Sequence, residues 1–192
     1  MGKIDIDENI IYIEDFISNE DLLVIQNSIK NNSYIEDFDH PVHTSLKVDS
    51  DKNAIDRWNK YIEDLKLMLE STNRKIKISS PNIIDLVKYR HTPLNAHDHN
   101  SEYLMLPHQD DASYDWEEDK KGPTFVSHGI VIFITDNFDG GEIVYVNKDI
   151  SIKPKAGSLL VHPGNLDYAH AVNRFYNGER IVYASFVHEN RK

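Results

Sequence analysis

The sequence contains no cysteine among its 192 residues. The chain can therefore form neither a disulfide framework nor a site that depends on thiolate ligands or a cysteine nucleophile. Any metal site must be built from histidine and carboxylate side chains, and the ten histidines leave ample choice. A chain without cysteine fits a cytoplasmic protein, which is the location that we expect.

Long hydrophobic runs and an excess of positive charge are also missing. No apolar stretch approaches the roughly 18 residues of a membrane-spanning helix, and the opening residues, MGKIDIDEN, lack the features of a signal peptide. We therefore expect no membrane association. The formal net charge is −11, which argues against nucleic acid as a partner because nonspecific binding to phosphates needs a basic face. A small basic pocket inside an acidic chain remains compatible with this composition.

The length fits one domain with a substantial core, so we predict a single domain over residues 1–192. Residues 1–75 are expected to form a helical support. One helix should begin at Ser18, because Ser18 and Asp21 have the spacing of a capping box. A second helix is predicted from about Ile55 to Ser71. The apolar positions of the two helices, for which we expect simple packing, are Leu22, Ile25 and Ile29 in the first and Ile55, Trp58, Ile62, Leu65 and Leu69 in the second.

Residues 76–192 have a different sequence pattern, with short runs of β-branched or aromatic residues such as FVSHGIVIFIT, GSLLVHP and RIVYASFVH. Turn signals separate these runs, among them Asp139-Gly140-Gly141 and Asn177-Gly178. Many short strands divided in this way predict a sandwich or barrel. We therefore expect a mainly β core of the α+β class, with the N-terminal helices packed on one sheet.

The segment PHQDDASYDW contains a candidate metal-binding pattern. His108 and Asp110 are two positions apart, so a strand would direct both side chains to the same face. A third ligand must come from elsewhere, and His170 is the natural candidate because it also lies among strand-like runs. Two histidines and one carboxylate on one side of an ion leave positions open for substrate and oxygen, as in non-haem iron oxygenases. The triplet alone is weakly specific, since about one occurrence is expected by chance in this composition.

In order and spacing the chain resembles the iron(II)- and 2-oxoglutarate-dependent oxygenases, especially the prolyl 4-hydroxylase-like branch. The resemblance includes an entry strand and helix in ENIIYIEDFISNEDLLVIQNSI, then HQD, VIFITDNFDGGEIVY, IKPKAGSLLVHPG and HAVNRFYNGER. It implies a double-stranded β-helix, which is a jelly roll of two facing sheets. It also implies that His108, Asp110 and His170 bind iron(II), and that Arg180 pairs with the distal carboxylate of 2-oxoglutarate. O2 would be the second cosubstrate and ascorbate an optional reductant, with no catalytic side chain needed beyond the metal centre.

The position of Arg180 raises a geometric conflict. A strict two-residue hairpin at Asn177-Gly178 would pair Phe175 with Arg180, and strand parity would then put Arg180 and His170 on opposite faces. A bulge, a longer loop or strands in opposite sheets would remove the conflict, and the implied fold has the last arrangement. Arginine suits the role because its planar guanidinium grips a carboxylate through two hydrogen bonds. The alternative is a surface ion pair.

Further aromatic residues are candidates for the site. In the family, a tyrosine on the strand before the HxD motif can hydrogen-bond 2-oxoglutarate, and Tyr89 or Tyr103 could do so here, with core packing as the alternative. The polar segment DASYDWEEDKKGP contains Tyr114 and Trp116. This segment is either a solvated loop or a lid that offers an aromatic contact to the substrate.

Of the remaining histidines, His128 and His162 lie in strand-like runs, where they would line the barrel. His91, His97 and His99 form a cluster within a polar loop, and we favour solvated side chains over a metal site there.

The resemblance implies a dioxygenase that hydroxylates its substrate and releases succinate and CO2. FITDNFDGGEIVY and PKAGSLLVHPG resemble the prolyl hydroxylases most, so we expect a peptidyl proline, with a small molecule or a free amino acid as the alternative. Nucleic-acid demethylases of the superfamily carry a second arginine six positions after the first, where this chain has Phe186. Many prolyl hydroxylases have lysine in place of Arg180, so the match is to the wider family. The alternative from another class is a non-catalytic jelly-roll binding module.

Overall fold

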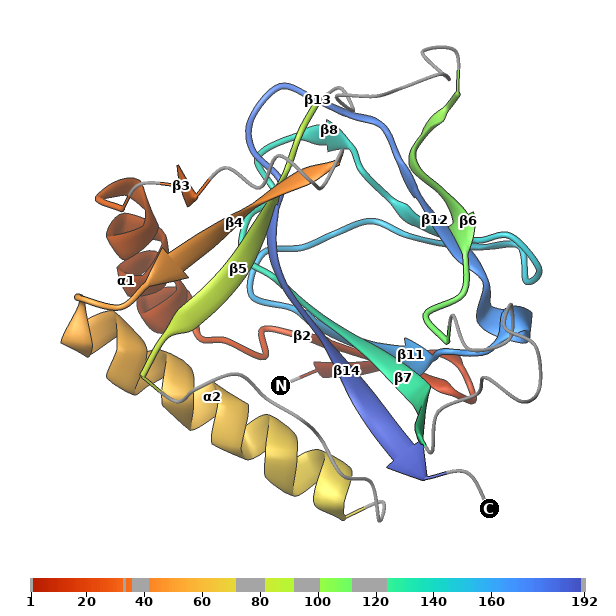
Figure 1. Ribbon diagram of the computed structural model, residues 1–192, viewed down its shortest axis with the longest axis horizontal. Coiled ribbons are helices and arrows are strands. Elements are labelled where there is room, and N and C mark those ends of the chain that lie inside the picture. The colour runs from red at the N-terminus through yellow and green to blue at the C-terminus, as the bar shows by residue number, and fades with distance from the viewer. Residues whose placement is uncertain are drawn as a thin grey trace.

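The computed structural model describes residues 2–32, 34–35, 42–71, 82–91, 101–111 and 124–190. Eight strands form the larger of its sheets, in the spatial order β1-β2-β11-β7-β14-β5-β4-β3 (Figure 1). Their bounds are Gly2–Asp7 (β1), Ile10–Glu14 (β2), Tyr34–Ile35 (β3), His43–Val48 (β4), Ile84–Tyr89 (β5), Thr124–Phe133 (β7), Leu159–Pro163 (β11) and Ile181–Asn190 (β14).

A smaller sheet faces the larger one and has the order β10-β9-β12-β6. Its strands are Tyr103–His108 (β6), Ile143–Tyr145 (β9), Ile150–Ile152 (β10) and His170–Asn173 (β12). A short pair, Asp139–Gly140 (β8) with Phe175–Tyr176 (β13), lies beside it, and a 3-10 turn at Leu166–Tyr168 (η3) precedes β12. All of the strand pairs in the described ranges are antiparallel.

Apolar side chains from the two sheets meet in a shared core. Phe133 and Val182 come from the larger sheet, whereas Tyr145 and Val172 come from the smaller one, and all four are buried in one cluster. Two facing sheets with a filled interior are the arrangement of a jelly roll, so the predicted fold class is confirmed.

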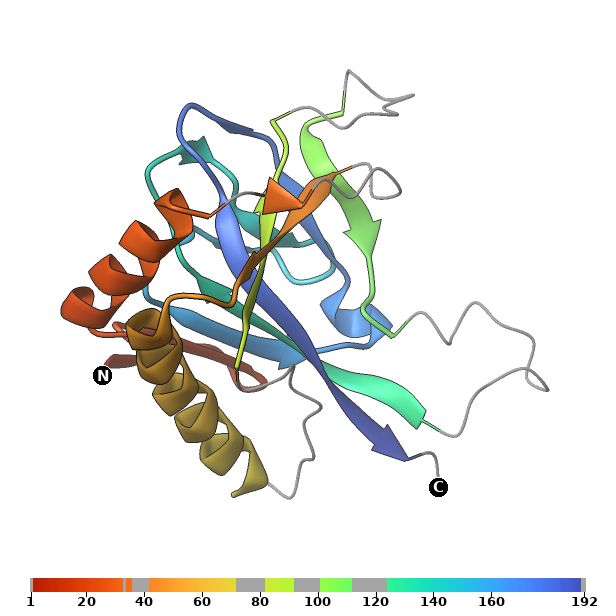
Figure 2. The same cartoon turned by 60° about the vertical axis from the view of Figure 1, so that its left-hand side comes forward.

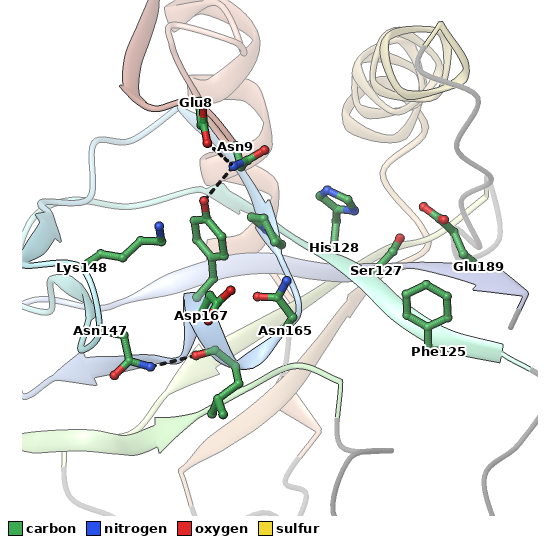
Figure 3. A pocket seen from close by; sticks show the side chains of 13 residues that line it. Glu8, Asn9, Phe125, Ser127, His128, Asn147, Lys148, Asn165, Asp167 and Glu189 are labelled. Atoms are coloured by element: carbon green, nitrogen blue, oxygen red, sulfur yellow. Dashed lines mark hydrogen bonds between the residues drawn. The ribbon is translucent and has the colours of Figure 1, made fainter. Parts of the chain in front are cut away.

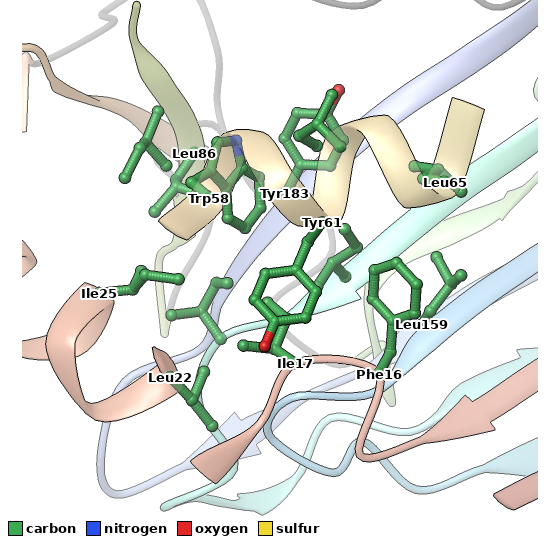
Figure 4. Packing of buried hydrophobic residues seen from close by; sticks show 14 of the residues in the cluster. Phe16, Ile17, Leu22, Ile25, Trp58, Tyr61, Leu65, Leu86, Leu159 and Tyr183 are labelled. Carbon is green, nitrogen blue, oxygen red and sulfur yellow. The ribbon is translucent and has the colours of Figure 1, made fainter. Parts of the chain in front are cut away.

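Two helices cover the opposite face of the larger sheet, as Figures 1 and 2 show. Helix α1 spans Asn19–Lys30 and helix α2 spans Lys52–Glu70. On α2, Trp58 stacks edge-on against Tyr183 of β14 with ring centroids 5.2 Å apart, within the cluster drawn in Figure 4. The predicted apolar positions of both helices are buried in this cluster, which confirms that they serve packing. Neither helix has the length and apolar character needed to cross a membrane.

The ends of the helices follow from capping. The backbone N–H of Asp21 donates to Ser18 Oγ at 3.2 Å, as predicted. Helix α2 begins before Ile55 because Asp51 caps it, with its Oδ1 accepting from the Ala54 N–H at 3.1 Å. The expectation that residues 1–75 are mainly a helical support was too narrow, since β1, β2, β3 and β4 lie in this region and join the larger sheet. The backbone pairing of β2 with β11 joins β2 to the core strands, and β1 is added to the sheet through its own pairing with β2.

The chain passes from the smaller to the larger sheet between β12 and β14. The strict hairpin does not form, because Phe175 pairs with Gly140 instead of Arg180. Asn177 and Gly178 both have positive φ, +58° and +53°, so the predicted turn is present. An added Cβ at Gly178 would clash with the backbone carbonyl oxygen of Asn137, and glycine is therefore required there. His170 consequently begins β12 of the smaller sheet, whereas Arg180 directly precedes β14 of the larger one, which removes the conflict of strand parity.

Candidate metal centre and its cavity

The three predicted metal ligands lie together inside the roll. His108 ends β6 and is the direct register partner of His170, which begins β12. Their ring centroids are 4.5 Å apart, and Asp110 follows His108 by two residues. One ligand atom from each of His108, Asp110 and His170 lies within 4.8 Å of the others. Adjacent antiparallel strands thus bring together residues that are far apart in the sequence.

Backbone carbonyls orient the two imidazoles. The Nδ1 atom of His108 lies 2.9 Å from the carbonyl oxygen of Leu106, and that of His170 lies 3.2 Å from the carbonyl oxygen of Tyr168. In the tautomer that donates from Nδ1, each ring keeps the lone pair of Nε2 for a metal ion. The donor set is therefore two imidazole nitrogens and one carboxylate, which suits iron(II).

Burial changes the protonation of this cluster. It lowers the pKa of His170 well below its usual value, with further lowering by His162 and His108, so the ring is neutral and ready to bind a metal. It raises the pKa of Asp110 to about 6, an effect that His108 partly opposes. The Oδ2 atom of Asp110 is buried and has no hydrogen-bond partner among the described residues. A divalent cation would compensate this buried carboxylate, and the residues present therefore fit a metal ion.

Arg180 lies in the same cavity on the side of the larger sheet. Its side chain is only 1% exposed, and neither Nε nor Nη1 has a hydrogen-bond partner within the part of the chain that the structure describes. The guanidinium carbon lies 4.4 Å from the centroid of the Tyr89 ring. Burial lowers the pKa of Arg180, whereas Tyr89 raises it, and a guanidinium stays charged in proteins in any case. A buried cation with free donors calls for an anionic partner, so the alternative of a surface ion pair is wrong.

One cavity of about 90 Å³ joins the two features. His108, Asp110 and His170 line one part of it, and Tyr89 and Arg180 line another. Apolar residues complete the lining, including Met105, Val131, Val172 and Phe186. A small diacid could therefore contact a metal at one end and Arg180 at the other.

The two candidate tyrosines have different positions. Tyr89, the last residue of β5, lines the cavity and contacts Arg180. Tyr103, the first residue of β6, is the register partner of Asn173 and does not line it. Of the two, the structure favours Tyr89 for a contact with a bound acid. Tyr114 and Trp116 lie outside the described residues.

His162 was predicted to line the barrel, and it does so at the metal centre itself. The side chain is 1% exposed, and its Nε2 lies 3.7 Å from Asp110 Oδ2. Burial lowers the pKa of His162 to about 4, so the ring is neutral at pH 7. No local sequence pattern links His162 to Asp110, because the contact depends on how β11 pairs with β7.

A larger pocket of about 980 Å³ opens near η3 and the first residues of β7 (Figure 3). Several of its polar groups bond to one another or to adjacent residues. Asn9 donates to Tyr168 Oη at 2.9 Å, Tyr168 Oη donates to Asp7 Oδ1 at 2.7 Å, and Asn147 donates to the carbonyl oxygen of Leu166 at 2.9 Å. The smaller cavity, with its unpartnered buried charges, is therefore the better candidate for chemistry despite its size.

Two facing sheets with a His-Asp-His cluster between them define a double-stranded β-helix protein with a site suited to a divalent metal. No family model and no curated protein matches the chain. Solved structures do, and among them is a viral collagen prolyl hydroxylase from Paramecium bursaria Chlorella virus-1 in complex with 2-oxoglutarate. It has a TM-score of 0.65 and 14% identity, over 94% of this chain and 96% of that one.

Two further prolyl hydroxylases have the same arrangement. A Pseudomonas putida prolyl 4-hydroxylase has a TM-score of 0.58 and 13% identity, over 96% of this chain and 93% of that one. A Trichoplax adhaerens prolyl hydroxylase, in complex with a peptide fragment of hypoxia inducible factor, has a TM-score of 0.61 and 13% identity, over 93% and 83%. At these identities the likeness establishes the fold, so this chain has the fold of the prolyl hydroxylases.

Proposed function

We propose that the protein is an iron(II)- and 2-oxoglutarate-dependent dioxygenase that hydroxylates a peptidyl proline. The observation that carries the proposal is the joint position of two features in one cavity. One is the cluster of His108, Asp110 and His170, and the other is the buried guanidinium of Arg180. A binding module of the same fold has no need of both a metal-ligand set and an unpaired buried cation beside it.

Each side chain has a distinct task in this proposal. His108, Asp110 and His170 would hold iron(II), which with bound 2-oxoglutarate and O2 supplies the oxidising chemistry and yields succinate and CO2. Arg180 would grip the distal carboxylate of 2-oxoglutarate, and Tyr89 would support the guanidinium from its side. These residues bind and orient, and none of them has to act as a general base.

Two of the similar structures support a peptidyl substrate. One belongs to a collagen prolyl hydroxylase, and another holds a peptide fragment. The cavity also presents Ala184 and Phe186 of β14, and Phe186 is 40% exposed. An apolar side chain that is partly open to solvent suits the ring of a proline. A free amino acid or another small molecule is the second candidate, since a small cavity accepts it equally well.

Succinate formation tests the proposal directly. Purified protein with iron(II) and 2-oxoglutarate should form succinate slowly without substrate and faster with a proline-rich peptide, which should gain one oxygen by mass spectrometry. His108→Ala should abolish turnover. Arg180→Met keeps much of the side-chain volume, and it should weaken 2-oxoglutarate binding while cobalt(II), a stand-in for iron(II), still binds. Protein that binds no metal and forms no succinate would instead be a binding module.

A further inference from the structure

Asp110 lies outside the strand that carries the neighbouring candidate ligand. Strand β6 ends at His108, and Asp110 follows two residues later. Among the described residues β6 pairs with β12 alone, and the register of that pair shifts twice. The pairing of β6 therefore fixes His108 directly, whereas the position of Asp110 must depend on contacts of the residues after the strand.

Asp111 connects the segment after β6 to the larger sheet. Its backbone N–H donates to the carbonyl oxygen of Gly164 at 2.9 Å, and its side-chain Oδ1 accepts from the Val126 N–H of β7 at 3.4 Å. Its own carbonyl oxygen accepts from Gln109 Nε2 at 3.1 Å. Asp111 is only 3% exposed, so water cannot readily replace a lost partner and each of these bonds is costly to break.

The attachment point lies where the strand pairing of β7 is interrupted. Strand β11 ends at Pro163, whose register partner on β7 is His128, so Val126 lies two residues beyond the last pair. The pairing of β7 with β14 also shifts register next to Val126. An added Cβ at Gly164 would come within 2.6 Å of the Val126 carbonyl oxygen, so the close approach of the two backbones requires glycine. The carboxylate of Asp111 therefore supplies an acceptor that neither neighbouring strand provides.

The side chain of Asp110 enters a gap on the same strand. An added Cβ at Gly129 of β7 would clash with Asp110 Oδ2, so the carboxylate occupies space that a side chain at position 129 would otherwise fill. Gly129 has no positive φ that would call for glycine. Strand β7 thus contacts two successive residues, Asp110 at Gly129 and Asp111 at Val126.

We propose that Asp111 is a positioning residue for the metal centre. It fastens the segment after β6 to β7, and this attachment presents the Asp110 carboxylate to the two histidines of the smaller sheet. The inference rests on the metal site of the proposed function. Asp111 is not among the described side chains whose ligand atoms lie within 4.8 Å of one another, so it acts through Asp110 and not as a ligand. Without the attachment, metal binding would have to order the segment, and that loss of entropy would lower the affinity.

Cobalt(II) binding to the metal-free protein, measured by calorimetry without 2-oxoglutarate, tests the role of Asp111. Asp111→Ala removes the acceptor and should weaken cobalt(II) binding by about 10- to 100-fold, as loss of a group that orients a metal ligand commonly does. Asp111→Asn keeps an oxygen that can accept from the Val126 N–H, and its affinity should stay within about threefold of the unchanged protein.

Ser158→Ala is the matched control for a merely structural effect. Ser158 is fully buried, its Oγ donates to the carbonyl oxygen of Lys155 at 2.6 Å, and it does not line the metal cavity. Its loss should lower the thermal midpoint but leave cobalt(II) affinity unchanged. Equal losses of affinity in Asp111→Ala and Ser158→Ala would mean that Asp111 supports the fold and not the metal centre.

Other outcomes also overturn the inference. If the unchanged protein and Asp111→Ala bind cobalt(II) equally well, Asp111 has no positioning role although the proposed function stands. If Asp111→Asn loses as much affinity as Asp111→Ala, the negative charge matters and not the attachment. If the unchanged protein binds no cobalt(II), the proposed function and this inference fail together.

A measurement without substitution covers the case in which Asp111→Ala does not fold. In the metal-free protein, hydrogen exchange followed by NMR should show the amide protons of Asp111 and Val126 protected, because the attachment exists before the metal binds. Exchange of both amides at the rates of an unfolded chain, with protection only after zinc is added, would overturn the proposal.

Discussion

Asp110→Asn should make the metal-free protein more stable at pH 7 while it destroys metal binding. Burial raises the pKa of Asp110 from the ordinary 3.8 to about 6. One pKa unit corresponds to about 1.4 kcal/mol between the two protonation states, so ionised Asp110 costs the metal-free fold about 3 kcal/mol at pH 7. Asparagine avoids that charge but adds an N–H that must find an acceptor, which leaves an expected gain of about 1–3 kcal/mol.

The pH dependence gives this prediction a definite sign. Below the unfolded pKa, near 4, the carboxyl is protonated in both states and the native aspartate carries no penalty. The penalty grows between about pH 4 and pH 6, because over that range the unfolded state has lost the proton that the folded state still holds. The advantage of Asp110→Asn should therefore be largest at pH 7 and should disappear toward pH 4.

Urea unfolding of both proteins at several pH values, with chelator present, measures this difference. In a second series without chelator, free cobalt(II) at about 100 times its dissociation constant should stabilise the unchanged protein by about 2.7 kcal/mol and leave the variant nearly unaffected. Asp111→Asn is the matched control, because Asp111 is a neighbouring buried aspartate that accepts a hydrogen bond from the Val126 N–H, and its loss should not stabilise the fold. A variant at Asp110 that is no more stable at pH 7, or whose advantage does not change with pH, would refute the reasoning.

Three further predictions follow from the site and the packing. Cobalt(II) affinity should be about tenfold lower at pH 5 than at pH 7, because the Asp110 carboxyl, with a pKa of about 6, must lose its proton to bind. Calorimetry at the two pH values measures the two affinities, and equal values would contradict the prediction. Trp58→Ala should cost about 3–5 kcal/mol in urea unfolding, since it removes a buried ring stacked on Tyr183; a loss below 1 kcal/mol would show that the helix contributes little. Gly178→Ala should cost at least about 1–3 kcal/mol because of its positive φ and the clash with Asn137, and an unchanged unfolding midpoint would contradict the required glycine.

The sequence could predict the parts of the fold that depend on the spacing of residues close together in the chain. His108 and Asp110 lie together as their spacing of two predicted, although β6 ends at His108 and Asp110 lies two residues beyond it. The capped start at Ser18 is equally local. The contact of His162 with Asp110 could not be predicted, because it requires the register of β11 on β7 and the missing side chain of Gly129. The same holds for β2, whose partner β11 is distant in the sequence.

Arg180 illustrates an intermediate case. Its chemistry could be predicted from the residue type and from the resemblance. Simple strand parity, however, predicted that Arg180 faces away from the side on which His170 lies. The chain changes sheets after Asn177-Gly178, and no rule of alternation within one strand contains that information.

The change of sheets between His170 and Arg180 has a consequence for selectivity. One end of a bound acid would contact the smaller sheet and the other end the larger sheet. The distance between the two sheets would therefore determine how many carbons the acid can have. Facing sheets keep that spacing near 10 Å through their packed side chains. A diacid one carbon shorter would not contact both sheets, even if its end groups were the same. The packing between the sheets would thus determine the selectivity for the cosubstrate as much as Arg180 does.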